Sequence, residues 1–408
     1  MSKYSVEPDV LNLTNFCKGV AICLIVLNHY QKGWFGWQGV HVFIVMSGFG
    51  LAYSCLKKSE NPKSKAWYFK RTAKLLPAYW SVVFCLLLLG LGKRMFSSDS
   101  LSQGLLDSLN LLAKHVLINF LLLRNFIDGF FYDAPASFWF IPFIVSFYLF
   151  FPILFNYLKK NLSVKGCIKI LMVAMVIEFI YRAVSIYCLD GLPVGYDQKF
   201  LSFLPDSVLA LNHVPEALNH VPENIMGIPV PLQGKSLFGF FPARLAEFTL
   251  GSICAVAVIK DSNLLNKRIL NIYTGLIGLL IWVFGQFLLH IDLWGWIFAD
   301  FVIALGLVLL LLNIAYFFQT KVSAFFQILT WLGVSSYYIY LTHEPIMHTF
   351  HPIETKLFKS VGTGDVGYFV LKFLLFGLLL ALIYVASRIV MRFERANAFQ
   401  KFHKFLFR

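Results

Sequence analysis

Charged residues are scarce in this 408-residue chain. Lys, Arg, Asp and Glu together make up 14% of it, and hydrophobic residues make up 58%. A soluble domain carries roughly 25% charged residues and has no way to cover so much apolar surface. The composition therefore excludes an ordinary soluble domain and predicts an integral membrane protein.

Acidic residues are the scarcer sign, with 21 Asp and Glu against 35 Lys and Arg, so the formal net charge is +14. Most of the basic residues lie in short segments between apolar runs. Such a distribution is typical of cytoplasmic loops and not of a nucleic-acid-binding face. We therefore expect membrane lipid as a partner and no nucleic acid.

Metal-ligand spacing is also missing. The seven cysteines lie within or beside apolar runs and are interpreted as small core residues, so no metal site and no bound cofactor are expected. The first residues lack a basic segment followed by a short apolar stretch and a small-residue cleavage site. We expect no cleaved signal peptide, so the first apolar run should be the first span.

Apolar runs long enough to cross about 30 Å of hydrocarbon occur throughout the chain. The sequence predicts an all-α integral membrane protein in which residues 1–408 form one transmembrane domain, a bundle of about ten helices. The ten runs are Leu13–Tyr30, Gly39–Leu56, Leu75–Leu91, Phe138–Tyr157, Ile168–Cys188, Phe238–Ile259, Ile269–Leu289, Leu293–Phe317, Ile328–Met347 and Tyr368–Met391.

The basic segments predict the orientation of these spans. Residues 57–74 are the most basic in the chain and should be cytoplasmic. Counting spans alternately from there places the basic segments 159–169 and 260–268 and the tail 392–408 on the same side, with both termini inside. Residues 105–123 are apolar but interrupted by polar side chains. An eleventh span there would turn the later basic loops outward, so we interpret this stretch as an interfacial or re-entrant outer helix.

The longest polar stretch, about 190–235, is predicted to be an outer loop. It contains a tandem repeat, Ala-Leu-Asn-His-Val-Pro-Glu at 210–216 and again at 217–223. Two copies of seven residues are too few for a solenoid, so we interpret the repeat as a duplication in a tolerant loop. A weak metal site at its two histidines is the alternative.

Ionisable side chains inside spans are costly and are functional candidates by default. The first span holds Lys18 and His29, which eleven residues of helix separate by about 16 Å. On the predicted topology Lys18 lies at the cytoplasmic mouth and His29 toward the outer face. A histidine can take a proton from a hydroxyl near neutral pH, although a buried histidine is often structural.

These residues begin a series of motifs that resembles acyltransferase family 3, the membrane O-acyltransferases of bacterial surface glycans. A basic residue, ten others and then His is the family's opening, here Lys18 to His29. The matching pieces run in order over about 12–350, and the later ones are Gly39–Phe49, Tyr68–Tyr79, Ser137–Pro152, Arg244–Gly251 and Ser336–Pro345.

The chain departs from the family pattern at three places. His41 stands where the family usually has Asp, and Lys74 replaces the second of two arginines, after Arg71. Ile144, Val145 and Ser146 replace a Glu-Glu-Gln segment, so no role of those glutamates carries over.

The resemblance implies an O-acyltransferase in the bacterial cytoplasmic membrane. The donor would be a cytoplasmic acyl-coenzyme A, with acetyl-coenzyme A expected, whose phosphates Lys18, Arg71 and Lys74 would receive. Arg71 and Lys74 are otherwise positive-inside anchors. The acceptor would be a hydroxyl of a cell-surface polysaccharide or lipid-linked glycan near His29 and His343. His29 would act as general base or carry the acyl group transiently, and the sequence does not separate these mechanisms.

Other polar residues are weaker candidates for acceptor contact or support. Glu178 and Arg182 are spaced to pair on one helix face, as are Arg244 and Glu247. Asp300 could pair with Lys372 across helices. Trp139 and Tyr148 are either packing residues or acceptor contacts.

Two other classes of polytopic protein fit the composition. A glycan transporter or flippase is expected to show related halves with broken helices, and no such internal symmetry is visible. A glycan polymerase would carry a large, Arg-rich outer loop. The 190–235 loop is short and not Arg-rich.

Overall fold

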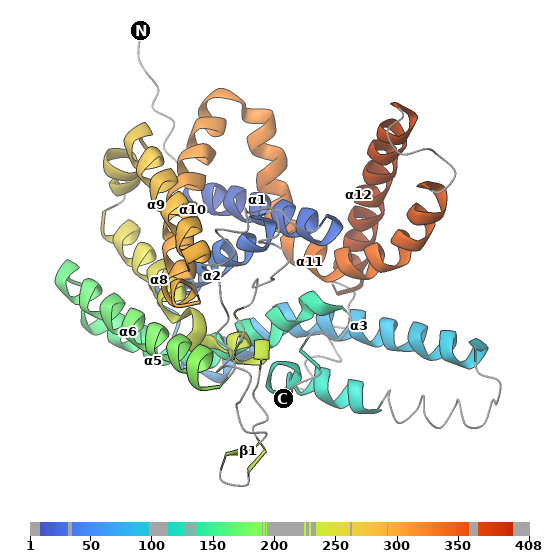
Figure 1. Ribbon diagram of the computed structural model, residues 1–408. Helices are drawn as coiled ribbons and strands as arrows, with labels where there is room; N and C mark the ends of the chain where they lie inside the picture. The colour runs from blue at the N-terminus through green and yellow to red at the C-terminus, as the bar shows by residue number, and fades with distance from the viewer. Residues whose placement is uncertain are drawn as a thin grey trace. The chain divides into compact units, whose positions relative to one another are not determined.

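A computed structural model describes most of the chain (Figure 1). The described residues are 9–31, 35–97, 113–127, 130–131, 135–189, 191, 193, 224–225, 228–229, 234–261, 263–291, 293–358 and 366–394. Within them the chain is helical almost throughout, which confirms the predicted all-α architecture. The one sheet in these ranges is a two-residue antiparallel pair, in which Asn224 lies opposite Pro229 and Ile225 opposite Ile228.

The long helices correspond to the predicted apolar runs. They are α1 (Val10–Tyr30), α2 (Gly39–Lys57), α3 (Lys65–Ser97), α5 (Phe140–Lys160), α6 (Val164–Cys188), α8 (Leu245–Lys260), α9 (Ile272–Ile291), α10 (Gly295–Lys321), α11 (Ser323–Phe358) and α12 (Val366–Glu394). Short 3-10 turns precede several of them: η1 (Phe35–Gln38), η2 (Arg124–Phe126), η3 (Ala136–Trp139), η7 (Gly234–Gly239) and η8 (Phe241–Arg244). The strands are β1 (Asn224–Ile225) and β2 (Ile228–Pro229), and η9 (Leu265–Ile269) is a π-helical turn.

Eight helical segments of the described chain are long and apolar enough to cross a membrane. Helices α6 and α11 cover the two other predicted runs but do not meet that length and composition test. A multi-pass membrane protein is therefore supported, while ten crossings and cytoplasmic termini stay predictions. Residues 105–112, the repeat at 210–223 and residues 395–408 lie outside the described residues, and 113–120 are helical.

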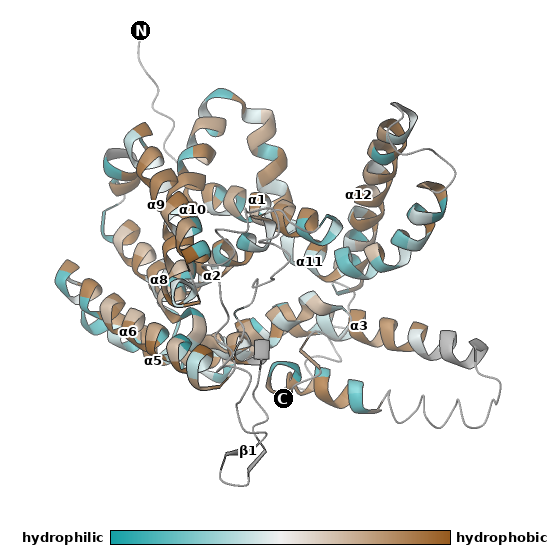
Figure 2. Cartoon of the chain, viewed as in Figure 1, coloured by the Kyte–Doolittle hydropathy of each residue, from teal (hydrophilic) through white to brown (hydrophobic). Residues whose placement is uncertain are grey.

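Side-chain exposure follows the expected pattern for helices that face lipid. Along α9, Tyr273, Leu280 and Phe287 are 76%, 68% and 60% exposed, and Phe373 of α12 is 78% exposed. Figure 2 shows hydrophobic residues along the length of both helices. Large apolar side chains left open in this way need a hydrocarbon solvent, because no water-soluble surface would carry them in such continuous rows.

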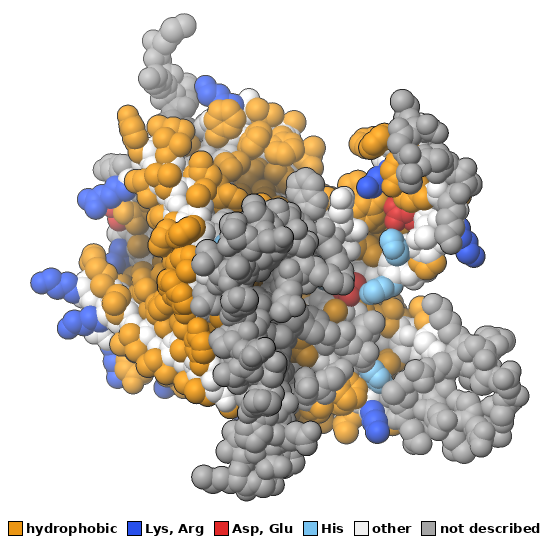
Figure 3. Space-filling view, viewed as in Figure 1, with side chains coloured by type: hydrophobic (Ala, Val, Ile, Leu, Met, Phe, Trp, Pro, Cys, Tyr) orange, Lys and Arg blue, Asp and Glu red, His pale blue; other side chains and the backbone are white. Residues whose placement is uncertain are grey.

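Two compact units make up the chain. Unit 1 comprises residues 1–64, 125–128 and 143–336, and unit 2 comprises residues 65–124, 129–142 and 337–408. In unit 1 a buried apolar cluster joins α1, α2 and α10 through Cys17, Ala21, Val45, Met46 and Leu307, among others. On the face of unit 1 shown in Figure 3, hydrophobic side chains form broad areas and Lys and Arg lie at the border.

Glycines bring the helices of unit 1 unusually close together. A Cβ atom added to Gly48 of α2 would overlap the carbonyl oxygen of Phe248, and one added to Gly251 of α8 would overlap that of Val45. Small residues at such crossings let helix backbones approach within a membrane, where van der Waals packing drives association. The crossing holds α2 against α8, the two helices that carry His41 and Glu247.

Unit 2 is built around α3, the C-terminal part of α11, and α12. The Tyr338 hydroxyl donates to Glu394 Oε2 at 2.5 Å, and the Tyr337 hydroxyl donates to the carbonyl oxygen of Leu75. These bonds tie α11 to both neighbouring helices. Because α11 also supplies His343, its rotation about its own axis is fixed near that residue.

Candidate functional site

Helix α1 carries the predicted base and one of the predicted cations. It runs without interruption through Lys18 and His29, so the separation of about 16 Å expected for a continuous helix holds. Lys18 is half-buried, whereas His29 is exposed in the last turn. The η1 turn folds back onto this end of α1, where Gly36 approaches Leu24 and Asn28. His29 therefore sits on a packed helix end with its imidazole accessible.

A buried group of ionisable side chains lies at the ends of four helices of unit 1. We call it the ionic cluster, and it consists of His41 of α2, Glu178 and Arg182 of α6, Arg244 and Glu247 at the start of α8, and Asp300 of α10. Each of these residues is at most 2% exposed. Charges removed this completely from water need partners, because an isolated buried charge costs several kcal/mol.

Asp300 is the centre of the ionic cluster. Its Oδ2 atom lies 2.6 Å from Arg182 Nη1 and 2.9 Å from Arg244 Nη2. Arg244 Nη1 also lies 3.0 Å from Glu247 Oε1, the pair expected from their spacing. One carboxylate thus bridges two guanidinium groups from different helices.

The remaining members of the cluster bond to helix ends. Arg182 donates to the carbonyl oxygen of Trp296 through Nε at 3.0 Å, and Glu178 Oε2 accepts the amide of Ala246 at 2.7 Å. Arg182 forms its ion pair with Asp300, and Glu178 lies close enough to Arg182 for electrostatic attraction, as their spacing on one helix face predicts. The ion partners of Asp300 within unit 1 are Arg182 and Arg244, and its expected pairing with Lys372 of unit 2 stays a prediction. The physical reason is tertiary: the first turns of α8 and α10 pack beside α6.

His41 occupies the middle of this arrangement. Its Nδ1 atom lies 3.1 Å from Glu247 Oε1 and 2.6 Å from Arg244 Nη1, and its Nε2 atom lies 3.8 Å from Asp300 Oδ1. The ring also meets Trp37 edge-on at 5.4 Å between centroids. The imidazole therefore stands between two carboxylates and beside one guanidinium group.

The predicted donor-binding pair lies in unit 2, on α3. Arg71 is half-buried with its guanidinium carbon 5.5 Å from the centroid of the Trp67 ring, while Lys74 is exposed. Three residues apart on a helix, the two side chains share one face. Both cations can therefore reach one anionic group, although Arg71 is held more firmly.

His343 of unit 2 is fully buried, and its Nδ1 atom lies 2.7 Å from the carbonyl oxygen of Tyr340. The adjacent Glu344 accepts the amides of Ala136 and Ser137 at 2.8 and 2.6 Å, at the start of η3. The Tyr340 hydroxyl donates to the carbonyl oxygen of Ser137. The middle of α11 therefore fixes the η3 turn.

The two aromatic candidates occupy different environments. Trp139, the last residue of η3, is 6% exposed and stacks on Phe131 with 5.6 Å between centroids. Tyr148, within α5, is half-buried. The surroundings of Trp139 fit packing better than acceptor contact.

Two important side chains escaped the sequence interpretation. Glu344 directly follows His343 but was not singled out, and Arg124 is 2% exposed and donates to the carbonyl oxygen of Pro135 at 2.8 Å. The position of Glu344, directly after the candidate His343, is the sequence signal that could have marked this carboxylate as a functional candidate. Arg124 lies at the end of an ambiguous apolar stretch, so its burial was not foreseeable. Among the residues that the structure describes, no group of three His, Cys, Asp or Glu side chains is placed to hold a metal ion.

Comparison with models of protein families shows which family the chain belongs to. The sequence model described as "Acyltransferase domain" matches residues 14–388, nearly the whole chain and parts of both units. The chain belongs to acyltransferase family 3. The Lys18 to His29 segment and the Arg244–Glu247 pair both lie inside the region matched by acyltransferase family 3.

Individual relatives match more weakly than the family does. Two Staphylococcus aureus proteins, of strains COL and MSSA476, are named provisionally as O-acetyltransferases and are 23% identical over 210 residues, covering 48% of this chain and 34% of each relative. A human orphan sodium- and chloride-dependent neurotransmitter transporter, NTT5, is 30% identical over 117 residues, which cover 27% of this chain and 16% of the transporter. The chain thus spans about a third or less of the curated relatives it matches. No solved structure matches.

Proposed function

We propose that this protein transfers an acyl group, with acetyl expected, from cytoplasmic acyl-coenzyme A to a hydroxyl of a cell-surface polysaccharide or lipid-linked glycan. The bacterial cytoplasmic membrane is its proposed location. Membership of acyltransferase family 3 and the eight apolar helices support an acyltransferase embedded in a membrane. Donor, acceptor and location are our inference from the arrangement of basic residues and histidines.

The observation that carries the proposal is the exposed His29 at the end of the α1 helix. An accessible imidazole can take the proton of an acceptor hydroxyl, so that the hydroxyl oxygen attacks the thioester carbonyl. The carbon–sulfur bond then breaks, and coenzyme A leaves as the thiol after receiving a proton. In the alternative mechanism His29 attacks first and carries the acyl group until the hydroxyl displaces it.

The donor would bind through its phosphates. Arg71 and Lys74 share a face of α3 and offer two cationic groups to one anion. Lys18 of α1 is the third cation proposed to receive the donor's phosphates. Arg is well suited to phosphate because its planar fork makes two parallel hydrogen bonds. The alternative, that Arg71 and Lys74 only anchor α3 at the inner face, predicts no change in donor affinity when they are removed.

The other candidates have supporting roles in this proposal. Arg244 and Glu247 are buried in the ionic cluster, so they would hold the ends of α2 and α8 in place and not contact the glycan. His343 is buried too and would act through the η3 turn fixed by Glu344. Trp139 and Tyr148 remain candidates for lining the acceptor path.

Thiol release by the purified protein in liposomes tests the proposal. With acetyl-coenzyme A and surface glycan from the source cells, free coenzyme A should appear together with O-acetylated glycan. The same cells lacking the gene should show less O-acetyl on their surface polysaccharide. Movement of glycan across the liposome membrane without thiol release would instead identify a flippase and contradict the proposal.

A further inference from the structure

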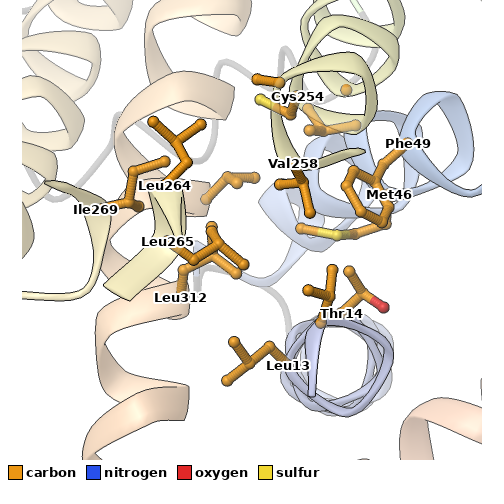
Figure 4. A pocket seen from close by; sticks show the side chains of 15 residues that line it. Leu13, Thr14, Met46, Phe49, Cys254, Val258, Leu264, Leu265, Ile269 and Leu312 are labelled. Carbon is orange, nitrogen blue, oxygen red and sulfur yellow. The ribbon is translucent and has the colours of Figure 1, made fainter. Parts of the chain in front are cut away.

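Unit 1 contains an apolar pocket that the proposed reaction does not use. It has a volume of about 80 Å³ and lies between α1, α2, α8, α10 and the η9 turn (Figure 4). Figure 4 shows Leu13 and Thr14 of α1, Met46 of α2, Cys254 of α8 and Leu312 of α10 around it. These side chains come from four helices that span about 300 residues of the sequence, from Leu13 to Leu312, so the pocket is a product of the fold.

The wall of the pocket offers no hydrogen bond to a ligand. Its lining residues are apolar apart from Thr14, whose hydroxyl already donates to the carbonyl oxygen of Leu11 at 2.9 Å. Apolar cavities of this kind stay dry and take hydrocarbon; one of about 150 Å³ holds the six carbons of benzene, so this one has room for roughly three. The matching ligand is a section of an alkyl chain.

The rim of the pocket faces both hydrocarbon and positive charge. Leu11 and Ile259, neighbours of the wall residues Val10 and Val258, are 48% and 41% exposed, so the wall continues into a lipid-facing surface. Leu264 and Leu265 also line the pocket, and the sequence around them, 260–268, has three cations and one acid.

The exposed cations next to the wall are Lys260, two residues beyond Val258, and Arg268, immediately before Ile269. The acid Asp261 is engaged locally, since it accepts the amide of Asn263 at 3.0 Å. Lys260 gives one of its three donors to the carbonyl oxygen of Leu162 at 2.5 Å and keeps two. Both exposed cations belong to segments that line the pocket, α8 and η9, so they are the candidates to receive a phosphodiester.

We propose that this pocket binds one acyl chain of an anionic phospholipid, whose phosphate meets Lys260 and Arg268. Basic sites between membrane helices are suited to anionic lipid headgroups, because each Lys or Arg near the membrane surface attracts anionic lipid. One section of the lipid's acyl chain lies in the pocket, and the rest of that acyl chain follows the lipid-facing surface beside Leu11 and Ile259.

The acyl chain of the donor fits less well than a phospholipid chain. Fifteen residues of α1 separate Thr14 from His29, which corresponds to about 22 Å. An acyl group lying in the pocket could not at the same time react at His29. The proposed lipid site is therefore independent of the transfer reaction, and its test measures lipid binding alone.

The test uses the full chain in nanodiscs of phosphatidylglycerol and phosphatidylcholine, extracted with mild detergent, with the retained lipid measured by mass spectrometry. Wild type should keep phosphatidylglycerol in preference to phosphatidylcholine. Ala257→Phe fills the pocket and should lower retention roughly tenfold or more, whereas Leu280→Phe, on the exposed side of α9 and not part of the pocket wall, should not. Lys260→Gln with Arg268→Gln should lower it by a similar factor, and Lys321→Gln at the exposed end of α10 should not.

A second measurement needs no substitution. Cys254 lines the pocket, so its alkylation by N-ethylmaleimide, followed by peptide mass spectrometry, should slow when phosphatidylglycerol is added in detergent and not when phosphatidylcholine is added. Equal retention by wild type and Ala257→Phe, or equal protection by both lipids, would overturn the proposal. Protection of Cys254 by butyryl-coenzyme A but not by phosphatidylglycerol would overturn it in favour of the donor chain.

Discussion

Replacing Asp300 with Ala tests whether the ionic cluster holds the helices of unit 1 together. Asp300 is 0% exposed and meets Arg182 and Arg244 at 2.6 and 2.9 Å. Without its carboxylate, Arg182 would lose its ion pair at 2.6 Å and keep the carbonyl oxygens of Trp296 and Ala243 and the nearby Glu178. Arg244 would keep its ion pair with Glu247 at 3.0 Å.

The cost follows from burial. Removing one partner of a buried ion pair destabilises a protein by about 3–5 kcal/mol, because a charge stays behind without compensation. Asp300 compensates two charges, so we expect a value at the upper end for Asp300→Ala. Asp300→Asn keeps an oxygen that accepts hydrogen bonds and should lose less. At roughly 2 °C per kcal/mol, Asp300→Ala should lower the apparent Tm by about 6–10 °C.

The assay can use the protein's own thiols. Cys17, Cys55 and Cys167 are buried, so a thiol-reactive fluorescent dye reports their exposure as the detergent-solubilised protein is heated. Asp261→Ala is the matched control, since Asp261 is exposed and its carboxylate only accepts a local amide. An Asp300→Ala protein with the same Tm as the Asp261→Ala control would refute the role given to the ionic cluster.

Three further outcomes follow from the structure. Replacing both Arg71 and Lys74 with Ala should raise the apparent KM for acetyl-coenzyme A roughly tenfold or more, through loss of charge-assisted bonds to phosphate, with expression unchanged; an unaltered KM would leave them as anchors. Gly251→Val should lower the Tm, because its side chain overlaps the carbonyl oxygen of Val45, whereas Gly50→Val meets no atom within 4 Å and should not. Cysteines placed in the 190–235 loop should react with an impermeant label only from outside intact cells, and labelling only after lysis would reverse the predicted topology.

Helix positions were the most predictable part of the fold. The predicted run Leu293–Phe317 corresponds to α10, Gly295–Lys321, because apolar length is a local property of the sequence. The start of α3 was less accurate: the helix begins at Lys65, ten residues before the predicted Leu75. Charged residues can continue a helix beyond the hydrocarbon, so hydropathy alone underestimates its length.

The polar site was predictable only where its contacts are local. The Arg244–Glu247 ion pair follows from their spacing, and the structure contains it at 3.0 Å. The bridging role of Asp300 depends on how the first turns of α8 and α10 pack beside α6, which no spacing along the chain reveals. The same holds for Glu344, whose partners in η3 lie more than 200 residues away.

The most direct test of the account is the activity of a His29→Gln protein. Gln keeps hydrogen-bonding groups but does not take up a proton near neutral pH, so it separates a base from a structural histidine. His290→Gln is the matched control, since His290 also lies in the last turn of an apolar helix. We expect His29→Gln to insert and accumulate normally but to release no coenzyme A and to leave the glycan without O-acetyl groups, while His290→Gln stays active. Near-normal O-acetylation by a well-expressed His29→Gln protein would contradict the assignment of His29 as the base.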